Sequence, residues 1–371
     1  MSGIHGGLAG SRQGVCSTSY GGANCHTTAG RCQHLGQQSR PRHTGARGRV
    51  GCVVTAARGR DDNLLVKWPA RQQVRSLAES VEAIGLGSWK LRGSMSKPFE
   101  ALTAVIEGTW RQAFDQELCL YPLPQDLKFV DSMDQSNTCG AWSYLDLANP
   151  AKGQEGYPRL LIENRAYCSR VFRKLHIELA HRQDGMQVMH CVLYPRLDYD
   201  IPILSLDMVG NEKGEVSLAI VDPCPCVLDG SIPDLHREAA RQLQEKYGLQ
   251  NNRKIPEWGQ DIFSDMCVIM RPQSHDELQR FMLYCNDLHR VYLHLSFQVP
   301  PLTAQSDSGR KMENVRAAHI RYCEKQQENS KTTRVLQSAL GEEVARRYMS
   351  EVMFDAPQQQ TDSALEPLAA E

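Results

Sequence analysis

The sequence predicts an α/β protein, a three-layer α/β/α sandwich around a central antiparallel sheet. Apolar residues recur with period two in the middle of the chain and with helical spacing at both ends. Between 171 and 222, short turn-bearing links separate successive strands, so neighbouring strands should be antiparallel. Both faces of 201-IPILSLDMV-209 are apolar, and such a sheet must be covered on both sides. Helices before and after the strands can supply the two covers.

The elements follow from these patterns in chain order. After Gly- and Ser-rich 85–97, helical spacing begins near residue 98, and the prolines of 121-YPLP-124 mark a loop. Strands are expected at about 126–132, 141–146, 158–167, 171–181, 186–194, 201–209 and 216–222. Helices are expected at 63–83, 98–116, 232–247, 274–296, 310–329 and 332–353.

Residues 1–60 differ in composition from the rest of the chain. They hold eight Arg and 13 of the 28 Gly, but no Lys, Asp or Glu. An Arg-rich, acid-free segment with Ser and Thr is typical of an organelle transit peptide, and a plain disordered tail is the alternative. We expect a transit peptide over 1–60, a partly helical extension over 61–96, a folded domain over 97–355 and a disordered tail over 356–371.

Charge and cysteine content exclude several classes of protein. Without the eight Arg of residues 1–60, 34 of the 42 basic residues remain against 43 acidic ones, about −9 in charge. Such an acidic body lacks the basic stripe of a nucleic-acid binder, and no apolar run approaches the ~20 residues of a membrane-spanning helix. Thirteen scattered Cys fit a reducing compartment. Cys224 and Cys226 form the only close pair; nothing at ligand spacing completes a metal site, so both should be buried apolar residues.

A predicted hairpin carries titratable side chains where a buried sheet usually has Val or Ile. The loop 183-QDG-185 suits a three-residue turn with Gly185 in the left-handed region, which pairs Arg182 with Met186. A two-residue turn at Asp184-Gly185 is the alternative and would change the register. With period two, one face of the first strand carries Phe172, Lys174, His176, Glu178 and Ala180.

The three-residue turn sets Glu178 directly opposite His190, and a symmetric following turn sets His190 opposite Asp207. His176 lies one step from this row. Each residue alone is more typical of a satisfied core or surface side chain. Four titratable groups on one covered face are costly unless they are used, because buried charge is expensive. No compact metal-ligand motif is present, so the residues favour proton donation to a bound substrate.

Longer runs carry a resemblance to a known family. The runs IENRAYCSRVFRKLHIELA, MHCVLYP and DIPILSLDMV resemble the ferredoxin-dependent bilin reductases, and 319–355 is similar to the branch that forms phycocyanobilin. The similarity covers about 97–355, with insertions such as 146–158. It implies four-electron reduction of biliverdin IXα to phycocyanobilin through bilin radicals. It also implies no bound cofactor or metal, reduced ferredoxin as external electron donor, a monomer and a plastid (stromal) location.

The resemblance also implies roles for single residues. Glu178 of HIELA is the proton donor for the D-ring vinyl group of the bilin. His190 of MHCV and Asp207 of SLDMV contact the central and lactam groups and pass protons, while His176 supports the network through water. Relatives that perform only two-electron reductions generally lack the Glu and keep the Asp. Glu178 therefore favours the four-electron reaction.

Five further positions match the family's substrate pocket, and they are Arg253, Trp258, Asn329, Lys331 and Val335. Arg253 and Lys331 are implied partners of the two bilin propionates; without the resemblance, solvated surface charge would be the better interpretation. An acidic ferredoxin needs a local basic patch for docking. Candidates for that patch are Arg173, Lys174, Lys331, Arg334, Arg346 and Arg347.

Two alternatives stay open on the sequence. One is a two-electron bilin reductase that gives a phytochromobilin or phycoerythrobilin-type product. The other is a tetrapyrrole-binding protein without turnover that uses the same pocket for storage or delivery. The identity of the product separates the first alternative from the four-electron reaction, and a spectral response to reduced ferredoxin separates the second.

Overall fold

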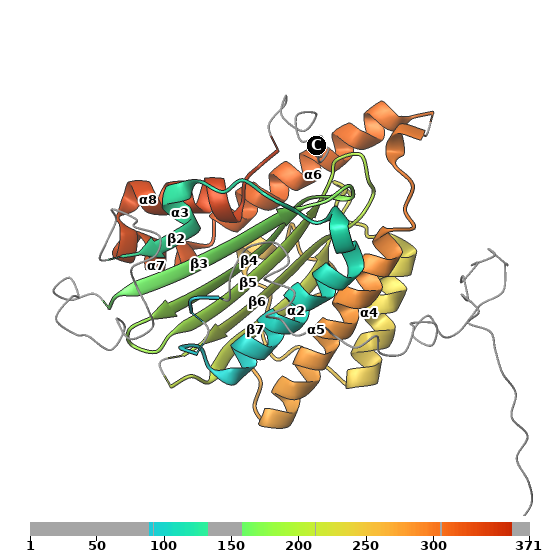
Figure 1. The fold of residues 1–371 in the computed structure, drawn as a ribbon. Helices are drawn as coiled ribbons and strands as arrows, with labels where there is room; N and C mark the ends of the chain where they lie inside the picture. The colour runs from blue at the N-terminus through green and yellow to red at the C-terminus, as the bar shows by residue number, and fades with distance from the viewer. Residues whose placement is uncertain (1–88, 92, 133–157, 212, 305, 358–371) are drawn as a thin grey trace, which may run out of the picture. The chain divides into compact units, whose positions relative to one another are not determined.

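The central sheet of the computed structural model is antiparallel, and helices lie on both of its faces (Figure 1). The structure describes residues 89–91, 93–132, 158–211, 213–304 and 306–357, all within the unit Asp61–Glu371. The strand order is β1-β3-β4-β5-β6-β7-β8, with β2 also paired to β3. The strands are β1 Cys119–Leu120, β2 Phe129–Asp131, β3 Leu160–Cys168, β4 Phe172–Arg182, β5 Gln187–Pro195, β6 Ile203–Gly210, β7 Val216–Cys224 and β8 Val268–Met270.

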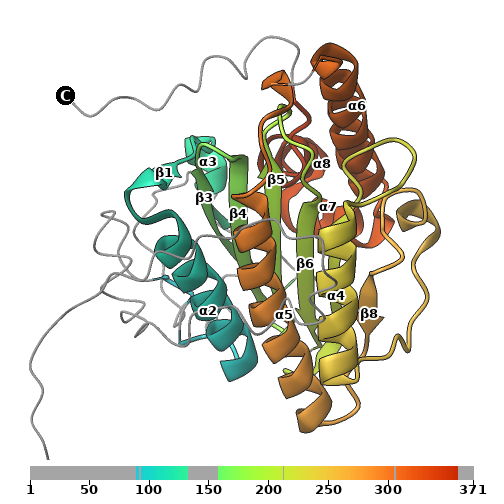
Figure 2. The same ribbon diagram turned by 90° about the vertical axis from the view of Figure 1, so that its right-hand side faces the viewer.

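The two faces of the sheet have separate helical covers (Figure 2). Helices α2, α4 and α5 cover one face, where Leu175 and Ile177 of β4 pack with Trp110. The C-terminal helices cover the other, where Ala180 of β4 packs with Tyr348. The predicted three-layer α/β/α sandwich is confirmed. The longer helices are α2 Lys97–Phe114, α4 Asp234–Tyr247, α5 His275–Ser296, α6 Ser308–Gln327, α7 Ser330–Leu340, α8 Glu342–Arg347 and the π-helical turn η6 Tyr348–Met353.

The predicted hairpin turn between β4 and β5 is confirmed. The amide of Arg182 donates to Met186 O at 2.8 Å and the amide of Gly185 to Arg182 O at 2.8 Å, which makes a three-residue loop. Gly185 has φ 96°, a conformation that side chains with a Cβ rarely adopt. The loop therefore fixes the register of the whole β4–β5 pair.

The C-terminal helix expected over 332–353 is wrong as a single element. Gly341, with φ 82° and ψ 164°, separates α7 from α8, and α8 continues as the π-helical turn η6. That backbone region is nearly exclusive to glycine. The break divides the cover over this face of the sheet into shorter helices.

The predicted face of β4 is wrong at one residue. A register shift between Phe172 and Lys174 turns Phe172 to the α2/α5 face, where its ring lies 5.8 Å from that of Phe114. A bulge puts two residues opposite one on the partner strand, so the alternation of faces is interrupted there. Arg173 and Lys174 then both reach the C-terminal segment.

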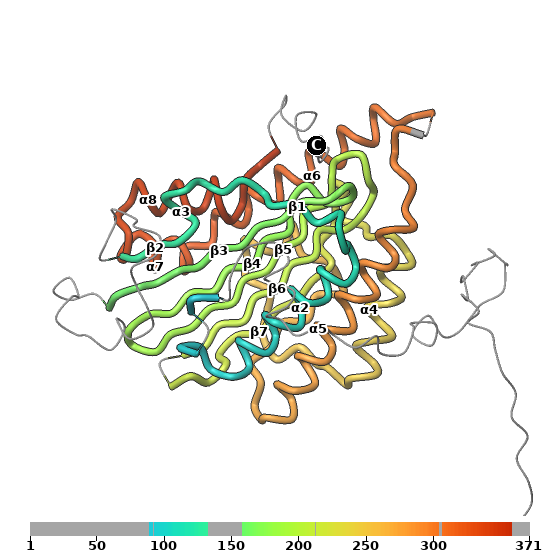
Figure 3. Tube along the Cα trace, viewed as in Figure 1, coloured from blue at the N-terminus to red at the C-terminus, as the bar shows by residue number. Residues whose placement is uncertain are grey.

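Strands β1 and β8 were not predicted, because such short strands show little alternation. The strand expected over 126–132 is wrong in its first part, where helix α3 Gln125–Lys128 precedes β2. Figure 3 shows β1 beside the sheet, where it pairs with the end of β3. The helix expected at 63–83, the strand expected at 141–146 and the segment 1–60 lie outside the described residues. Within the described part of the chain, no helix combines the length and apolarity needed to cross a bilayer.

Candidate active site

Four polar side chains form a row across neighbouring strands on the face covered by the C-terminal helices. Asn164 of β3 is opposite Glu178 of β4, Glu178 is opposite His190 of β5, and His190 is opposite Asp207 of β6. His176 lies two residues before Glu178 on β4. The predicted convergence of Glu178, His190, Asp207 and His176 is confirmed as geometry. All except Asp207, which is partly exposed, are buried.

His190 and Asp207 form the closest pair in the row. Nδ1 of His190 lies 2.6 Å from Oδ1 of Asp207. Burial by itself would lower the pKa of His190, but the Asp207 carboxylate and its hydrogen bond outweigh burial, so the pKa is raised. Nε2 of His190 is buried and has no hydrogen-bond partner in the described ranges. The raised pKa favours the imidazolium form, in which the N–H at Nε2 has no acceptor among the described residues and can be donated.

His176 has the opposite electrostatic character. Its pKa is well below the ordinary value because of burial and because the positive charge of Lys174 and then His190 lie nearby. Its Nε2 lies 3.0 Å from Oδ1 of Asn164. The orientation of the Asn164 amide is fixed by its Nδ2, which donates to Leu127 O at 2.9 Å. His176 is thus a neutral ring that carries its proton on Nε2, and its acceptor Nδ1 has no partner among the residues that the structure describes.

Tyr348 of η6 connects Glu178 to Asn164. Its hydroxyl oxygen lies 2.8 Å from Oδ1 of Asn164 and 2.9 Å from Oε2 of Glu178. A phenol has one proton, and the Asn164 oxygen can only accept. When the Tyr348 proton is donated to Asn164, the second contact is a hydrogen bond only if Glu178 is a carboxylic acid that donates to Tyr348. Burial raises the pKa of Glu178, which agrees with a protonated carboxyl.

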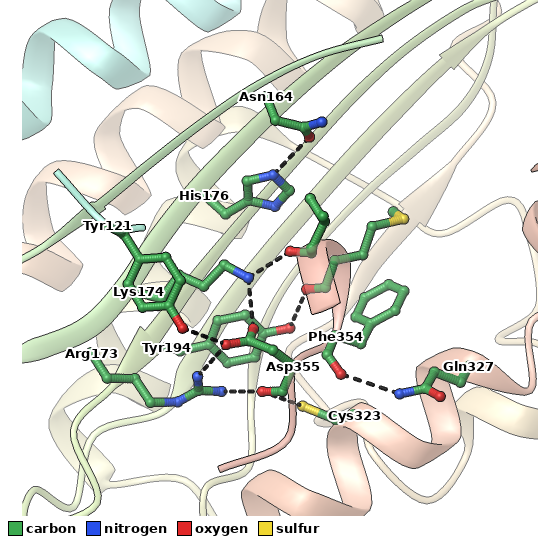
Figure 4. Close-up of polar contacts among 12 residues, drawn as sticks. Tyr121, Asn164, Arg173, Lys174, His176, Tyr194, Cys323, Gln327, Phe354 and Asp355 are labelled. Carbon is green, nitrogen blue, oxygen red and sulfur yellow. Dashed lines mark hydrogen bonds and ion pairs between the residues drawn. The ribbon is translucent and has the colours of Figure 1, made fainter. Parts of the chain in front are cut away.

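Beside this row, a second polar cluster binds the end of the C-terminal segment through hydrogen bonds and ion pairs (Figure 4). Asp355 accepts hydrogen bonds from Tyr121 at 2.8 Å, from Arg173 at 3.1 Å and from Lys174 at 2.6 Å. Lys174 also donates to the carbonyl of Val352. Burial would raise the pKa of Asp355, but the two cations hold it below its ordinary value. This cluster also positions the side chain of Phe354, because Phe354 is adjacent to Asp355 in the chain.

Phe354 contacts His190 with ring centroids 5.6 Å apart, and His190 contacts His176 with ring centroids 5.8 Å apart.

The docking role predicted for Arg173 and Lys174 is wrong. Both side chains are buried, and they hold Asp355 in place. A buried positive side chain that forms an ion pair with an internal carboxylate cannot contact another protein.

The predicted substrate-binding residues lie on the loop before β8 and on α7 with its N-cap. Trp258 packs against Phe263, 5.7 Å between ring centroids, and borders the same apolar cluster as Ala180 of β4. Arg253 is exposed. Trp258 and Phe263 thus place the loop before β8 beside the C-terminal helices, and the propionate role of Arg253 stays a prediction.

Asn329 is the N-cap of α7, where its side-chain oxygen accepts from the amides of Lys331 and Thr332. Lys331 is exposed and Val335 is partly buried. Asn329 thus has a structural task that the sequence did not indicate. The pocket roles of Asn329, Lys331 and Val335 stay predictions.

Cys224 ends β7 and Cys226 follows it, and both are fully buried, which confirms them as small buried side chains. Over the described ranges, no group of three or more His, Cys, Asp and Glu side chains has the arrangement of a metal site.

Sequence reasoning missed Asn164, Tyr348 and Asp355. Asn164 gave no distinct signal, because it lies between polar Glu163 and Arg165 in β3, a strand that is buried throughout. Tyr348 and Asp355 gave none, since their partners are about 170 and 180 residues away in the chain.

Comparison with known proteins identifies the family. A sequence model of the ferredoxin-dependent bilin reductases matches residues 107–355. Phycocyanobilin:ferredoxin oxidoreductase of Synechococcus elongatus is 38% identical over 266 residues, which cover 69% of this chain and 92% of that protein. The enzyme of the same name from Trichodesmium erythraeum is 31% identical over 252 residues, 68% of this chain and 90% of that protein.

A solved structure shares the fold. Tomato phytochromobilin synthase in complex with biliverdin superposes with a TM-score of 0.50 at 15% identity, over 69% of this chain and 82% of that one. The sandwich, the extent of the match and the identity to the two oxidoreductases agree with each other. The chain belongs to the ferredoxin-dependent bilin reductases, a family of oxidoreductases.

Proposed function

We propose that this protein reduces biliverdin IXα to phycocyanobilin with four electrons, taken singly from reduced ferredoxin, and four protons. The observation that carries the proposal is the row Glu178–His190–Asp207, because it sets a carboxyl with a raised pKa beside a charged imidazole–carboxylate pair. Proton donors that are already loaded suit a substrate that acquires negative charge one electron at a time. The similarity to two enzymes named phycocyanobilin:ferredoxin oxidoreductase adds support.

In the proposed reaction, the bilin holds each unpaired electron and the protein supplies protons. Glu178 donates to the D-ring vinyl group, and the His190–Asp207 pair donates to the central and lactam groups. His176 accepts and returns protons through Nδ1, the nitrogen that Asn164 leaves free. Arg253 and Lys331 bind the propionates, and Trp258, Asn329 and Val335 line the pocket.

The decisive experiment is anaerobic turnover of biliverdin with reduced ferredoxin, followed by chromatographic identification of the product. Phycocyanobilin supports the proposal. A phytochromobilin or phycoerythrobilin-type product favours the two-electron alternative. Tight biliverdin binding without any spectral change favours a storage or delivery protein.

The variant Glu178→Gln tests the donor assigned to the D-ring. Gln has nearly the same shape and can accept from Tyr348, but it has no acidic proton to give. We expect the variant to form no phycocyanobilin and to release bilins that keep the D-ring vinyl group. Undiminished phycocyanobilin formation would rule out this role of Glu178.

Ferredoxin docking is proposed at the exposed basic residues of the C-terminal helices. Lys331 and Arg334 are exposed, whereas Arg346 and Arg347 are engaged with Glu343 and with Asp126 and Glu351. The charge reversal Arg334→Glu should raise the KM for ferredoxin, and more so at low ionic strength, and Lys331→Glu should raise it too but would also remove a proposed propionate partner. Lys213→Glu in the β6–β7 loop is the matched control. Equal effects of the reversals and the control would remove this face from consideration.

Residues 1–60 are proposed to direct the protein to the plastid stroma. The support is their Arg-rich and acid-free composition. A fluorescent protein fused after residue 60 should enter plastids, and cytosolic fluorescence would contradict the proposal.

A further inference from the structure

Two cysteines lie directly opposite each other at the edge of the sheet, away from the row of titratable groups. In the antiparallel pair of β1 with β3, Cys119 is the partner of Cys168 and Leu120 is the partner of Tyr167. Directly opposed residues in such a pair project to the same side, with Cβ atoms about 5 Å apart. The two thiols are therefore neighbours, although 49 positions separate them in the chain.

The hydrogen bonds of the pair define its spacing. The amide of Tyr121 donates to Ala166 O at 3.0 Å, so Tyr121 and Ala166 occupy a hydrogen-bonded position of the ladder. Cys119 and Cys168 lie two residues further along each strand, which is again such a position. Opposed Cα atoms there are about 5.5 Å apart, inside the roughly 4.4–6.8 Å that disulfides span. Sγ of Cys168 also points to β1, because it lies 3.9 Å from Leu120 O.

The two thiols differ in access to solvent. Cys119 is exposed and Cys168 is buried beside it. Every other cysteine in the described part of the chain is buried. A small oxidant in solution can thus reach Cys119 first, and Cys168 is the thiol placed to complete the reaction.

We propose that Cys119 and Cys168 form an oxidative modification site, a dithiol that closes to an intramolecular disulfide at the expense of a small-molecule disulfide such as oxidised glutathione. Cys119 loses its proton, attacks one sulfur of oxidised glutathione and releases one glutathione thiol. Cys168 then loses its proton, attacks Cys119 Sγ and releases the second glutathione thiol. The two cysteines lose two electrons and two protons in total, and one oxidised glutathione becomes two reduced ones.

The bond would join β1 covalently to β3, close to the cluster that holds the C-terminal segment. Tyr121 follows β1 by one residue and donates to Asp355 in the cluster that holds the C-terminal segment. Burial raises the pKa of Cys168, so ring closure should be faster at alkaline pH than at neutral pH. Oxidation should also slow hydrogen exchange at the Tyr121 amide, because opening of β1 would require β3 to move with it.

The experiment is peptide mapping of the full chain after incubation with oxidised glutathione. Free thiols are blocked with N-ethylmaleimide under denaturing conditions, and the protein is digested with trypsin. Cleavage after Arg111, Lys128, Arg165 and Arg170 gives peptides 112–128 and 166–170, each with a single cysteine. The expected result is one cross-linked species of these two peptides, which dithiothreitol separates. Cys119→Ser should abolish it, and Cys267→Ser, at a buried cysteine elsewhere, should leave it unchanged.

Recovery of both peptides with alkylated cysteines, even at a large excess of oxidised glutathione, would overturn the proposal. So would a mixed disulfide of glutathione on Cys119 that never proceeds to the cross-link. Hydrogen exchange at Tyr121 provides an independent reading. Equal exchange in cross-linked and reduced protein would show that the bond does not restrain β1 as argued.

Discussion

Replacing Asp207 by Asn tests the electrostatic core of the site. The substitution keeps an oxygen that can accept from His190 Nδ1, now 2.6 Å from the carboxylate, and removes only the negative charge. A hydrogen bond to a charged group contributes about 1.5–3 kcal/mol and a neutral one about 0.5–1.5 kcal/mol. The difference is roughly 1–1.5 kcal/mol, or about one pH unit of the His190 pKa at 1.36 kcal/mol per unit.

The direction of the effect follows from the raised pKa of His190 in the folded protein. Because folding raises this pKa above its unfolded value near 6.5, the pair stabilises the fold fully below that pH. The stabilisation is lost as the pH rises through the folded pKa. In Asp207→Asn, the midpoint of His190 should fall by about one unit and this pH window of extra stability should shrink.

NMR titration of protein with ¹³Cε1-labelled histidine measures the midpoint directly, with the His190 signal assigned from His190→Gln. If turnover needs the imidazolium, the alkaline limb of kcat/KM should move to lower pH by the same amount. Asp265→Asn, at an exposed residue that pairs with Arg237, is the control. An unchanged His190 midpoint in Asp207→Asn would refute the electrostatic reasoning.

Three further substitutions test the C-terminal cover of the sheet. Gly341→Ala should cost about 1–3 kcal/mol from backbone strain alone, since no atom of the described residues beyond its chain neighbours lies within 4 Å of the added Cβ. Gly309→Ala, also in open space but in a helix, is the control and should be neutral or stabilising, as measured by urea midpoints. Tyr348→Phe should cost about 1–3 kcal/mol by leaving polar partners unsatisfied, and equal stability of this variant and the parent protein would contradict the bond to Glu178. Asp355→Asn should cost about 3–5 kcal/mol, because two buried cations lose their carboxylate, and a thermal midpoint unaffected by the change would refute the cluster.

The sheet and much of the site could be predicted from local sequence. Gly185 indicated the three-residue turn, and the turn set the register that brings Glu178 to His190. The next turn brought Asp207 into the same row. Period-two alternation and turn length suffice here, because the partners are close in the chain and the sheet permits few registers.

The C-terminal contributions could not be predicted in this way. The contact of Tyr348 with Glu178 depends on how helices pack over the sheet, which no local pattern specifies. Arg173 and Lys174 were predicted to be surface charges. Their burial depends on a bulge and on a carboxylate far away in the chain, and local sequence shows neither. Gly341 is a visible helix breaker, but continuous apolar spacing on both sides of it favoured one helix.

The amide of Asn164 limits the routes by which a proton could move between Glu178 and His176. Its oxygen receives donors from two directions, Tyr348 on one side and His176 on the other, and it has no proton of its own to pass on. A proton wire needs groups that both accept and release, so the chain of contacts from Glu178 ends at this oxygen. In the proposed reaction, Glu178 and His176 therefore cannot exchange a proton through Asn164. His190, which is opposite Glu178 and in ring contact with His176, is the titratable group that adjoins both.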